Sequence, residues 1–481
     1  MLAPRIFSKR RAFLFLLLVG LLAGLVVVSS GLGEFCDEDG YCEIPGIRFG
    51  ARRGPGDAAK KPPRRAGGRK TGPRRDCVDF PDTSDVLLVM KTGASESFGR
   101  VSNQILTNLK CLPDFLIFSD MAQDFAGYAI HDSLDAVLDE VRRNNSDFDL
   151  YNRQQRCAVD VGSCNKNHDV SQEAWNLDKY KNIHMAEKAF ALRPDHEWYL
   201  FVDADTYVVW PTMMRWLRAL NPDEAHYIGS VAYIGEVPFA HGGSGYLVSK
   251  AAMQKMFRGK TGVGNSWDER VAQECCGDYM FAIALKNETG VEVKNAWPTV
   301  NGEKPHTLPY AEDQWCQPIV TMHHVSAQEV SELWALEKER NFSAPLRIKD
   351  LYHEFVEEQL VPTRDAWDNM SDDVFYLNRS ASDYSEYELS MAKEGRLSKL
   401  EQHAHQSFED CRRVCKSIRS CLQYRFWNGI CSTSKALKHG VPTKVEKEKW
   451  WEYRSGWDMT RIQKWVKSHG KCRKPQYPTS W

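Results

Sequence analysis

Short apolar runs alternate with helix-like stretches between residues 85 and 340. Asp85–Lys91 (DVLLVMK) and Phe115–Ser119 (FLIFS) predict two buried strands, and Trp198–Asp203 (WYLFVD) predicts a third. The apolar positions of Trp175–Phe190 recur with helical spacing, which predicts a helix before the third strand. Strands that alternate with helices indicate an α/β fold with a mostly parallel sheet, in which ligands bind beyond the carboxyl ends of the strands.

The first 76 residues have a different pattern. Residues 12–33 are uncharged and mostly apolar, and about 20 such residues suffice for a helix that spans a bilayer. The basic flanking residues all lie in the tail formed by residues 1–11, which predicts a type II signal anchor with a cytosolic N-terminus. A cleaved signal peptide is the alternative. Residues 34–76 lack an apolar period and become rich in Lys and Arg, so we expect a flexible stem. Proteolysis at Arg74-Arg75 would release a soluble form, whereas a solvated linker needs no such event.

Charge and cysteine content narrow the class of protein. The 481 residues contain 63 Lys and Arg against 64 Asp and Glu, a balance that argues against a general nucleic-acid binder. The basic stem hides an excess of acid in the rest of the chain. Fourteen cysteines are too many for an ordinary cytosolic protein of this size and indicate an oxidising compartment. Glycosylation triplets agree with this, and they begin at Asn144, Asn287, Asn341, Asn369 and Asn378.

Two carboxylates directly follow the third predicted strand, in Asp203-Ala204-Asp205. Acids at the end of a buried strand are costly unless they are neutralised, and oxygen ligands suit Mn²⁺ or Mg²⁺. Such an ion can also bind the diphosphate of a nucleotide-sugar. A lone D-x-D is a weak signal because it also occurs in turns and at helix caps, but its place after an apolar strand strengthens it.

Four ordered motifs carry a more specific resemblance. They are WYLFVDADTYVVWPTMMRWL from Trp198, AHGGSGYLVSK from Ala240, Gly277-Asp278-Tyr279, and VTMHHVSAQEVSELWAL from Val320. Together they resemble glycosyltransferase family 31, in the branch of the core 1 β1,3-galactosyltransferases and Fringe. The resemblance implies a GT-A catalytic domain over residues 77–340, with a Rossmann-like mixed sheet flanked by helices. It also implies a Golgi membrane protein whose catalytic domain is lumenal.

The same resemblance implies a metal-dependent, inverting reaction. A hexose, galactose from UDP-galactose in the favoured reading, would pass in β1,3 linkage to a glycoprotein or oligosaccharide acceptor. One alternative is a Fringe-like transfer of N-acetylglucosamine from UDP-GlcNAc. Another is an inactive, membrane-anchored protein that binds glycans or proteins. A homodimer is allowed, and no nucleic acid is expected as a partner.

The resemblance assigns the metal ligands. It implies that Asp205 binds the metal directly and that Asp203 supports both the metal and the donor's ribose. His323 would complete the metal site, with His324 as the competing residue. The family's Asp-Asp-Asp is Asp-Ala-Asp here, and Ala204 in the middle leaves the donor sugar open. Imidazole suits Mn²⁺ better than Mg²⁺.

The resemblance also assigns a catalytic base and the donor contacts. Asp278 occupies the position of the family's base, although Gly277 replaces the usual acid before it, and a helix N-cap is the alternative role. The donor would meet Gly243 in a glycine-rich loop and Thr92 and Gly93 after the first strand. It would also meet the following helix, where Asp178 or Lys181 would reach uracil or phosphate unless they only face solvent.

The last third of the chain has a weaker pattern. Residues 341–400 are polar and predict a glycosylated linker or a segment that wraps around the folded body. Residues 401–475 contain a cysteine pattern that resembles a PAN/apple module. That resemblance implies a small disulfide-stapled α+β domain that binds protein or carbohydrate, or that is only a structural appendage. It also implies the disulfides Cys411–Cys431 and Cys415–Cys421. Elsewhere, we expect Cys77–Cys111 and Cys157–Cys164 to pair.

Overall fold

The computed structural model describes residues 75–479 except 158, 379, 382 and 445–452. The predicted signal anchor over residues 12–33 and nearly all of the stem lie outside these residues. Among the described helices, none combines the length and the apolar character that a bilayer crossing requires.

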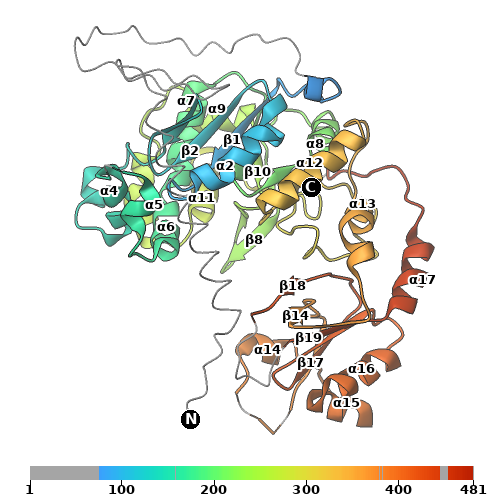
Figure 1. Cartoon of the computed structure of the whole chain (residues 1–481). Coiled ribbons are helices and arrows are strands. Elements are labelled where there is room, and N and C mark those ends of the chain that lie inside the picture. Colours follow the sequence, from blue (N-terminus) through green and yellow to red (C-terminus); the bar gives the residue numbers. More distant parts are fainter. Residues whose placement is uncertain (1–74, 158, 379, 382, 445–452, 480–481) are drawn as a thin grey trace, which may run out of the picture. The chain divides into compact units, whose positions relative to one another are not determined.

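An eight-stranded mixed sheet organises residues 77–340, which we call the large-sheet region (Figure 1). Its central strand β1 lies between β5 and β2 and is parallel to both, while β10 is antiparallel to β5. The strands predicted from apolar runs are confirmed as β1, β2 and β5. In spatial order the sheet contains β11 (Val293–Asn295), β7 (Tyr227–Gly229), β10 (Tyr246–Ser249), β5 (Trp198–Asp203), β1 (Val86–Lys91), β2 (Phe115–Ser119), β4 (Tyr128–Asp132) and β3 (Gln123–Phe125).

Helices cover both faces of this sheet, and side-chain alternation along the strands explains why. Leu87 and Val89 of β1 point into one hydrophobic core, whereas Leu88 and Met90 point into the other. The first core is closed by α7 (Lys181–Leu192), α9 (Lys250–Phe257) and α11 (Gly277–Thr289), and the second by α2 (Ser97–Leu106) and α8 (Trp210–Leu217). Because both faces are buried, the strands are continuous apolar runs rather than alternating ones.

Shorter elements surround the large sheet. A separate hairpin pairs β8 with β9, and β6 pairs with β12 in a two-residue ladder. The remaining elements of the region are β6 (Tyr207–Val208), β8 (Val231–Ile234), β9 (Val237–Ala240), β12 (Thr321–Met322), α3 (Asp139–Arg142), α4 (Asp149–Gln155), α5 (Val161–Asn165), α6 (Val170–Asp178), α10 (Asp268–Gln273) and α12 (Ala327–Glu339).

The helix predicted over Trp175–Phe190 is two helices, α6 and α7, so that prediction was wrong in its extent. The chain turns between them at Lys179 and Tyr180. The buried Tyr180 ring lies 4.7 Å from that of Phe148, and its hydroxyl donates to Asp147, which also pairs with Lys179. These tertiary contacts fix the turn, and the apolar spacing of the sequence does not reveal them.

Residues 341–479 form what we call the C-terminal region, and the segment expected to be a polar linker is built into it. Three strands in that segment belong to its sheets, and Leu346, Ile348 and Leu351 are buried in a core shared with the large-sheet region. The main sheet has the order β13-β19-β16-β17-β15 and is antiparallel throughout. Its strands are β13 (Thr363–Asp365), β15 (Val374–Tyr376), β16 (Gln423–Trp427), β17 (Ile430–Ser434) and β19 (Arg454–Trp457), and the other elements are β14 (Trp367–Asp368), β18 (Val441–Pro442), α13 (Ile348–Leu351), α14 (Glu386–Ser390), α15 (Lys399–His403), α16 (Phe408–Ser417) and α17 (Met459–His469).

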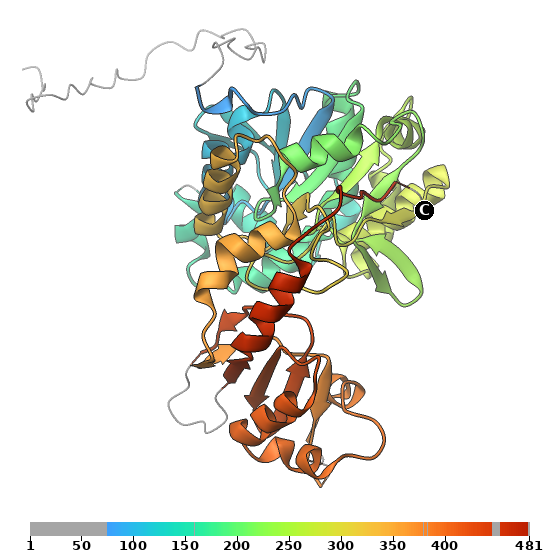
Figure 2. The ribbon, with the colours of Figure 1, turned by 90° about the vertical axis from the view of Figure 1, so that its right-hand side faces the viewer.

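The two regions are joined by covalent and hydrogen bonds. Cys316 of the large-sheet region forms a disulfide with Cys472, just after α17. Tyr310 and Leu437 exchange two backbone hydrogen bonds, of 2.8 and 3.1 Å. The tail beyond α17 returns to the large-sheet region, where the carbonyl of Pro478 accepts from Nε1 of Trp216 at 2.8 Å (Figure 2). The C-terminal region is therefore continuous with the rest of the folded chain.

All four predicted disulfides are confirmed. Cys77–Cys111 and Cys157–Cys164 lie in the large-sheet region. Cys411–Cys431 joins α16 to β17, and Cys415–Cys421 joins the end of α16 to the loop before β16. A further disulfide links the adjacent Cys275 and Cys276.

The five glycosylation triplets differ in accessibility. Asn144, Asn287 and Asn341 are exposed. Asn369 is completely buried, and its Nδ2 donates to the carbonyls of Tyr424 and Gly456 at 3.1 and 3.3 Å. A glycan at Asn369 is incompatible with this fold, which distinguishes it from the exposed sites.

Candidate active site

A polar cleft of about 380 Å³ opens at the carboxyl ends of β1 and β5. Lys91 and Asp203 are opposite each other in the parallel pairing of these strands, and both end them. Because parallel strands bring their carboxyl ends to one edge of the sheet, residues more than 100 positions apart in sequence together form the floor of the cleft. The lining includes the predicted residues Thr92, Gly93, Asp178, Lys181, Asp203, Asp205 and His323, together with His324.

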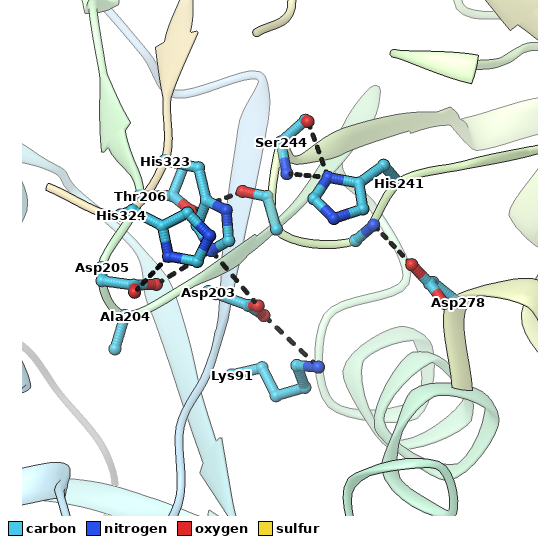
Figure 3. Close-up of polar contacts among 12 residues, drawn as sticks. Lys91, Asp203, Ala204, Asp205, Thr206, His241, Ser244, Asp278, His323 and His324 are labelled. Carbon is cyan, nitrogen blue, oxygen red and sulfur yellow. Dashed lines mark hydrogen bonds and ion pairs between the residues drawn. The ribbon is translucent and has the colours of Figure 1, made fainter. Parts of the chain in front are cut away.

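His323 reaches this cleft through a short strand pairing. β12 pairs with β6 so that Met322 is opposite Tyr207, and the next backbone contact joins the Val325 amide to the Asp205 carbonyl at 3.0 Å. This pairing places His323 beside the acidic motif although they are distant in sequence. Its Nε2 lies 3.2 Å from Oδ1 of Asp205 and 3.9 Å from Oδ2 of Asp203 (Figure 3).

His324 lies in the same group but is held differently. Its side chain is 72% exposed, and its Nδ1 lies 3.8 Å from Oδ2 of Asp205. Its backbone is left-handed, with a φ of 57°, which an ordinary residue adopts only when tertiary contacts enforce it. Asp205, His323 and His324 each direct one ligand atom into a single small volume, which could hold a metal ion. Either His323 or His324 could therefore supply the imidazole ligand.

The donor atoms fit a divalent cation. Carboxylate oxygens and imidazole nitrogens suit Mn²⁺ or a similar ion, and Asp205, His323 and His324 supply one such atom each, with Asp203 3.9 Å from His323. The backbone also leaves room for the His323 ring, because Gly243 has no side chain. A Cβ at Gly243 would lie 2.1 Å from Cε1 of His323. Any residue with a side chain would displace the His323 ring, which explains the glycine at this position.

The glycine-rich loop also contacts Asp278. This loop, residues 242–245, directly precedes β10. Because β10 is antiparallel to β5, the loop lies at the edge of the sheet where β5 ends. The Gly242 amide donates to Oδ2 of Asp278 at 2.7 Å, and a Cβ at Gly242 would lie 3.2 Å from that oxygen. Asp278 is the second residue of α11, and its Oδ1 accepts from the Tyr279 amide at 2.8 Å. The helix N-cap is Cys276, and no side chain caps it, so the alternative role of Asp278 as an N-cap was wrong. Asp278 and Gly243 are therefore next to the cleft, and neither contributes to its lining.

Gly277, which stands where the resembling family has an acid, has a packing role. Its added Cβ would lie 2.6 Å from Oδ1 of Asn182 and 2.8 Å from the Lys179 carbonyl. An acidic side chain has no room there. The start of α11 is thus pressed against the turn between α6 and α7, and this contact fixes the position of Asp278.

Four residues of the site were missed by the sequence reasoning. Lys91 pairs with Asp178 and lies 3.4 Å from Asp203, and Arg100 of α2 lies 2.5 Å from Oδ2 of Asp205. The His241 ring lies 5.7 Å from that of His323 and its Nδ1 lies 2.8 Å from the Ser244 hydroxyl. Trp175 lines the cleft. Two of them had a signal: Lys91 is a charge that ends an apolar strand, and His241 lies within the quoted motif that begins at Ala240.

Burial and close charges perturb the acids. Burial raises the pKa of Asp203, and the nearby Asp178 and Asp205 add to this although Lys91 and His323 oppose it. Burial acts in the same direction on Asp205, but His323 and Arg100 outweigh it and hold the pKa of Asp205 well below its usual range. Asp205 is therefore the carboxylate best kept ionised for a cation.

The fold and the site define an α/β protein with a charged cleft at the carboxyl ends of its strands, in which carboxylate and imidazole groups converge. Residues 143–295 match the protein-family model described as Fringe-like, which represents a glycosyltransferase family. The match includes Asp203, Asp205, Gly243 and Asp278, and it excludes His323 and the C-terminal region. The comparison with curated proteins found no match.

Proposed function

We propose that this protein is a metal-dependent, inverting glycosyltransferase that uses a UDP-sugar. The observation that carries the proposal is the convergence of Asp203, Asp205 and His323 on one cleft, within a chain whose central part matches a Fringe-like domain. These three residues would hold Mn²⁺ or Mg²⁺, with Asp205 as the principal ligand. Such an ion supplies a positive charge that stabilises the departing diphosphate.

In this proposal Asp278 is the catalytic base. An inverting transfer requires a group that takes the proton from the acceptor hydroxyl as that oxygen attacks the sugar. Oδ2 of Asp278 accepts from the Gly242 amide, and in the view of Figure 3 His241 lies between Asp278 and His323. We expect Asp278→Asn to abolish transfer and leave UDP-sugar binding largely intact. A comparable loss of binding would instead show that Asp278 only holds the glycine loop in place through the Gly242 amide.

The finer assignment is a β1,3-galactosyltransferase of the Golgi, of type II topology, acting on a glycoprotein glycan. It is supported by the ordered motifs around Asp203, Gly243, Asp278 and His323. A Fringe-like transfer of N-acetylglucosamine is the alternative within this class. We also propose that residues 401–475 form a PAN/apple-like module, because α16 and β17 carry that pattern's two disulfides.

One observation favours a second class, an inactive protein that binds glycans or proteins. Arg100 and Lys91 already pair with Asp205 and Asp203, so the chain itself partly neutralises the acidic motif. In an active enzyme these pairs must loosen when a cation binds. In a binding protein they would simply persist.

The deciding experiment is a donor panel with purified full-length protein. UDP release would be measured for UDP-galactose, UDP-GlcNAc and UDP-glucose, with Mn²⁺ and with EDTA. We expect one donor to dominate and EDTA to abolish its turnover. No turnover of any UDP-sugar with Mn²⁺ would refute the enzyme and favour the binding protein.

A further inference from the structure

One wall of the cleft is a single face of α6. Val170, Ala174 and Asp178 follow one another at intervals of four, and Ser171 and Trp175 form the adjacent row. All five line the cleft. Trp175 is the only Phe, Tyr or Trp among the described lining residues, and it is 58% exposed. Its indole is therefore a flat apolar surface presented to a ligand cavity.

The polar groups beside this wall are already balanced in charge. Lys91 pairs with Asp178, and Lys181 lies 3.4 Å from Asp178 and 3.5 Å from the buried Asp120. The Lys181 ammonium also donates to the Thr92 carbonyl at 3.1 Å. Because carboxylates neutralise both lysines, this end of the cleft has little net attraction for a phosphate group. It therefore suits an uncharged ring.

The opposite end of the cleft has a different chemistry. There Asp203, Asp205 and His323 converge, and beyond them lies the glycine loop with Asp278. The strand order β10-β5-β1-β2 spreads these groups along one edge of the sheet. The glycine loop lies at β10, the acidic motif at β5, and Lys91 at the end of β1, where Lys181 reaches the Thr92 carbonyl from α7. A nucleotide-sugar laid along this edge, with its diphosphate at β5 and its sugar toward Asp278, has its base on the β1 side.

We propose that Trp175 stacks on the base of the donor nucleotide and is a determinant of nucleotide affinity. The inference rests on the proposed function and deepens it by assigning the base end of the cleft. Every nucleobase has a flat π-face that an indole can cover, and such stacking excludes water from both surfaces. The ring covers no protein core, so removing it leaves the fold intact.

The test is direct binding, measured by calorimetry and tryptophan fluorescence in the presence of Mn²⁺. Full-length wild type, Trp175→Ala and Trp175→Phe are titrated with UDP and, separately, with inorganic pyrophosphate, which lacks the base. Trp297→Ala is the matched control, because Trp297 is 45% exposed and does not line the cleft. We expect Trp175→Ala to weaken UDP binding roughly 10- to 100-fold, with Trp175→Phe within a few fold of wild type. Pyrophosphate binding should not change, and UDP should quench fluorescence in wild type and Trp297→Ala only.

Three results would overturn the inference. Equal UDP affinity in wild type and Trp175→Ala would show that the ring does not contact the base. Equal weakening of UDP and pyrophosphate would show that Trp175 only shapes the cleft. Weakened binding of an acceptor glycan with unchanged UDP binding would move the ring to the acceptor site. If wild type binds neither UDP nor pyrophosphate with Mn²⁺, the proposed function fails together with this inference, a result distinct from the other three.

Discussion

The large-sheet region and the C-terminal region use their polar residues in opposite ways. The large-sheet region gathers acids, lysines and histidines at the ends of its central strands, where Asp203 is crowded by Lys91, Asp178 and Asp205. The C-terminal region instead uses polar groups to complete its fold. Asn369 and Gln423 are completely buried, and Gln423 donates to the Asn369 carbonyl at 2.7 Å. Perturbed, crowded charges indicate chemistry, whereas satisfied buried amides indicate structure.

The sharpest test of this contrast is Asp205→Asn. It removes the charge that the cation would use, so we expect transfer to fall roughly 1,000-fold, corresponding to the several kcal/mol that metal stabilisation supplies. UDP release and thermal unfolding would be measured together. Asp365→Asn is the matched control, since Asp365 lies in β13 of the C-terminal region and its side chain is 68% exposed. Retained activity in Asp205→Asn would remove the acidic motif from the mechanism.

Replacing Cys411 and Cys431 by Ser should lower the stability of the fold and leave the transfer rate nearly unchanged. This disulfide spans 20 residues of sequence, and losing a cross-link of that size costs about 3 kcal/mol of unfolding free energy. We expect urea denaturation to show this loss while transfer, measured well below the unfolding transition, stays near wild type. Lost transfer without lost stability would place part of the active site in the C-terminal region.

Gly243→Ala tests how closely the backbone approaches His323. The new Cβ would lie 2.1 Å from Cε1 of His323, so the ring must move by an ångström or more. A displacement of that size costs roughly 100-fold in rate. The control is Gly470→Ala at the end of α17, where the nearest atom would be at an ordinary 3.7 Å. Similar kinetics for Gly243→Ala and wild type would show that the ring position is not critical.

The last comparison concerns pH and the junction between the regions. Nδ1 of His439 lies 3.0 Å from Nδ1 of His306, and Arg364 donates to Nε2 of His439 at 3.3 Å. Burial, the nearby His306 and Arg364 lower the pKa of His439 from 6.5 to about 3, and burial also lowers the pKa of His306. The folded state binds these protons less readily than the unfolded chain. The stability is therefore complete above pH 6.5 and decreases as the pH falls toward 3, by at most about 1.4 kcal/mol per pH unit for each histidine.

Denaturation curves between pH 7 and pH 4 would measure this slope. We expect His439→Gln to reduce it, and the exposed His403→Gln to leave it unchanged. An unaltered slope in His439→Gln would mean that other groups cause the acid sensitivity.

The sequence by itself determined the elements whose signal is local. The continuous apolar runs of β1, β2 and β5 follow from burial on both faces, and Asp203 and Asp205 follow directly from the end of β5. The two disulfides of α16 were implied by the resemblance of a local cysteine pattern to a PAN/apple module. In each case the residues that decide the feature are adjacent in sequence or lie within one small motif.

Only the tertiary structure decided which distant residues share the site. Lys91 and His323 meet Asp203 and Asp205 because β1 pairs with β5 and β12 with β6, and Arg100 reaches Asp205 from α2. No single segment of the sequence specifies with which distant segment it will pair. The same reason applies to residues 341–400, whose polar composition suggested a linker although their few apolar residues fill a core supplied largely by other segments. A sequence states which residues are available, but the packing of segments far apart in the chain sets which charges are brought together and which are neutralised.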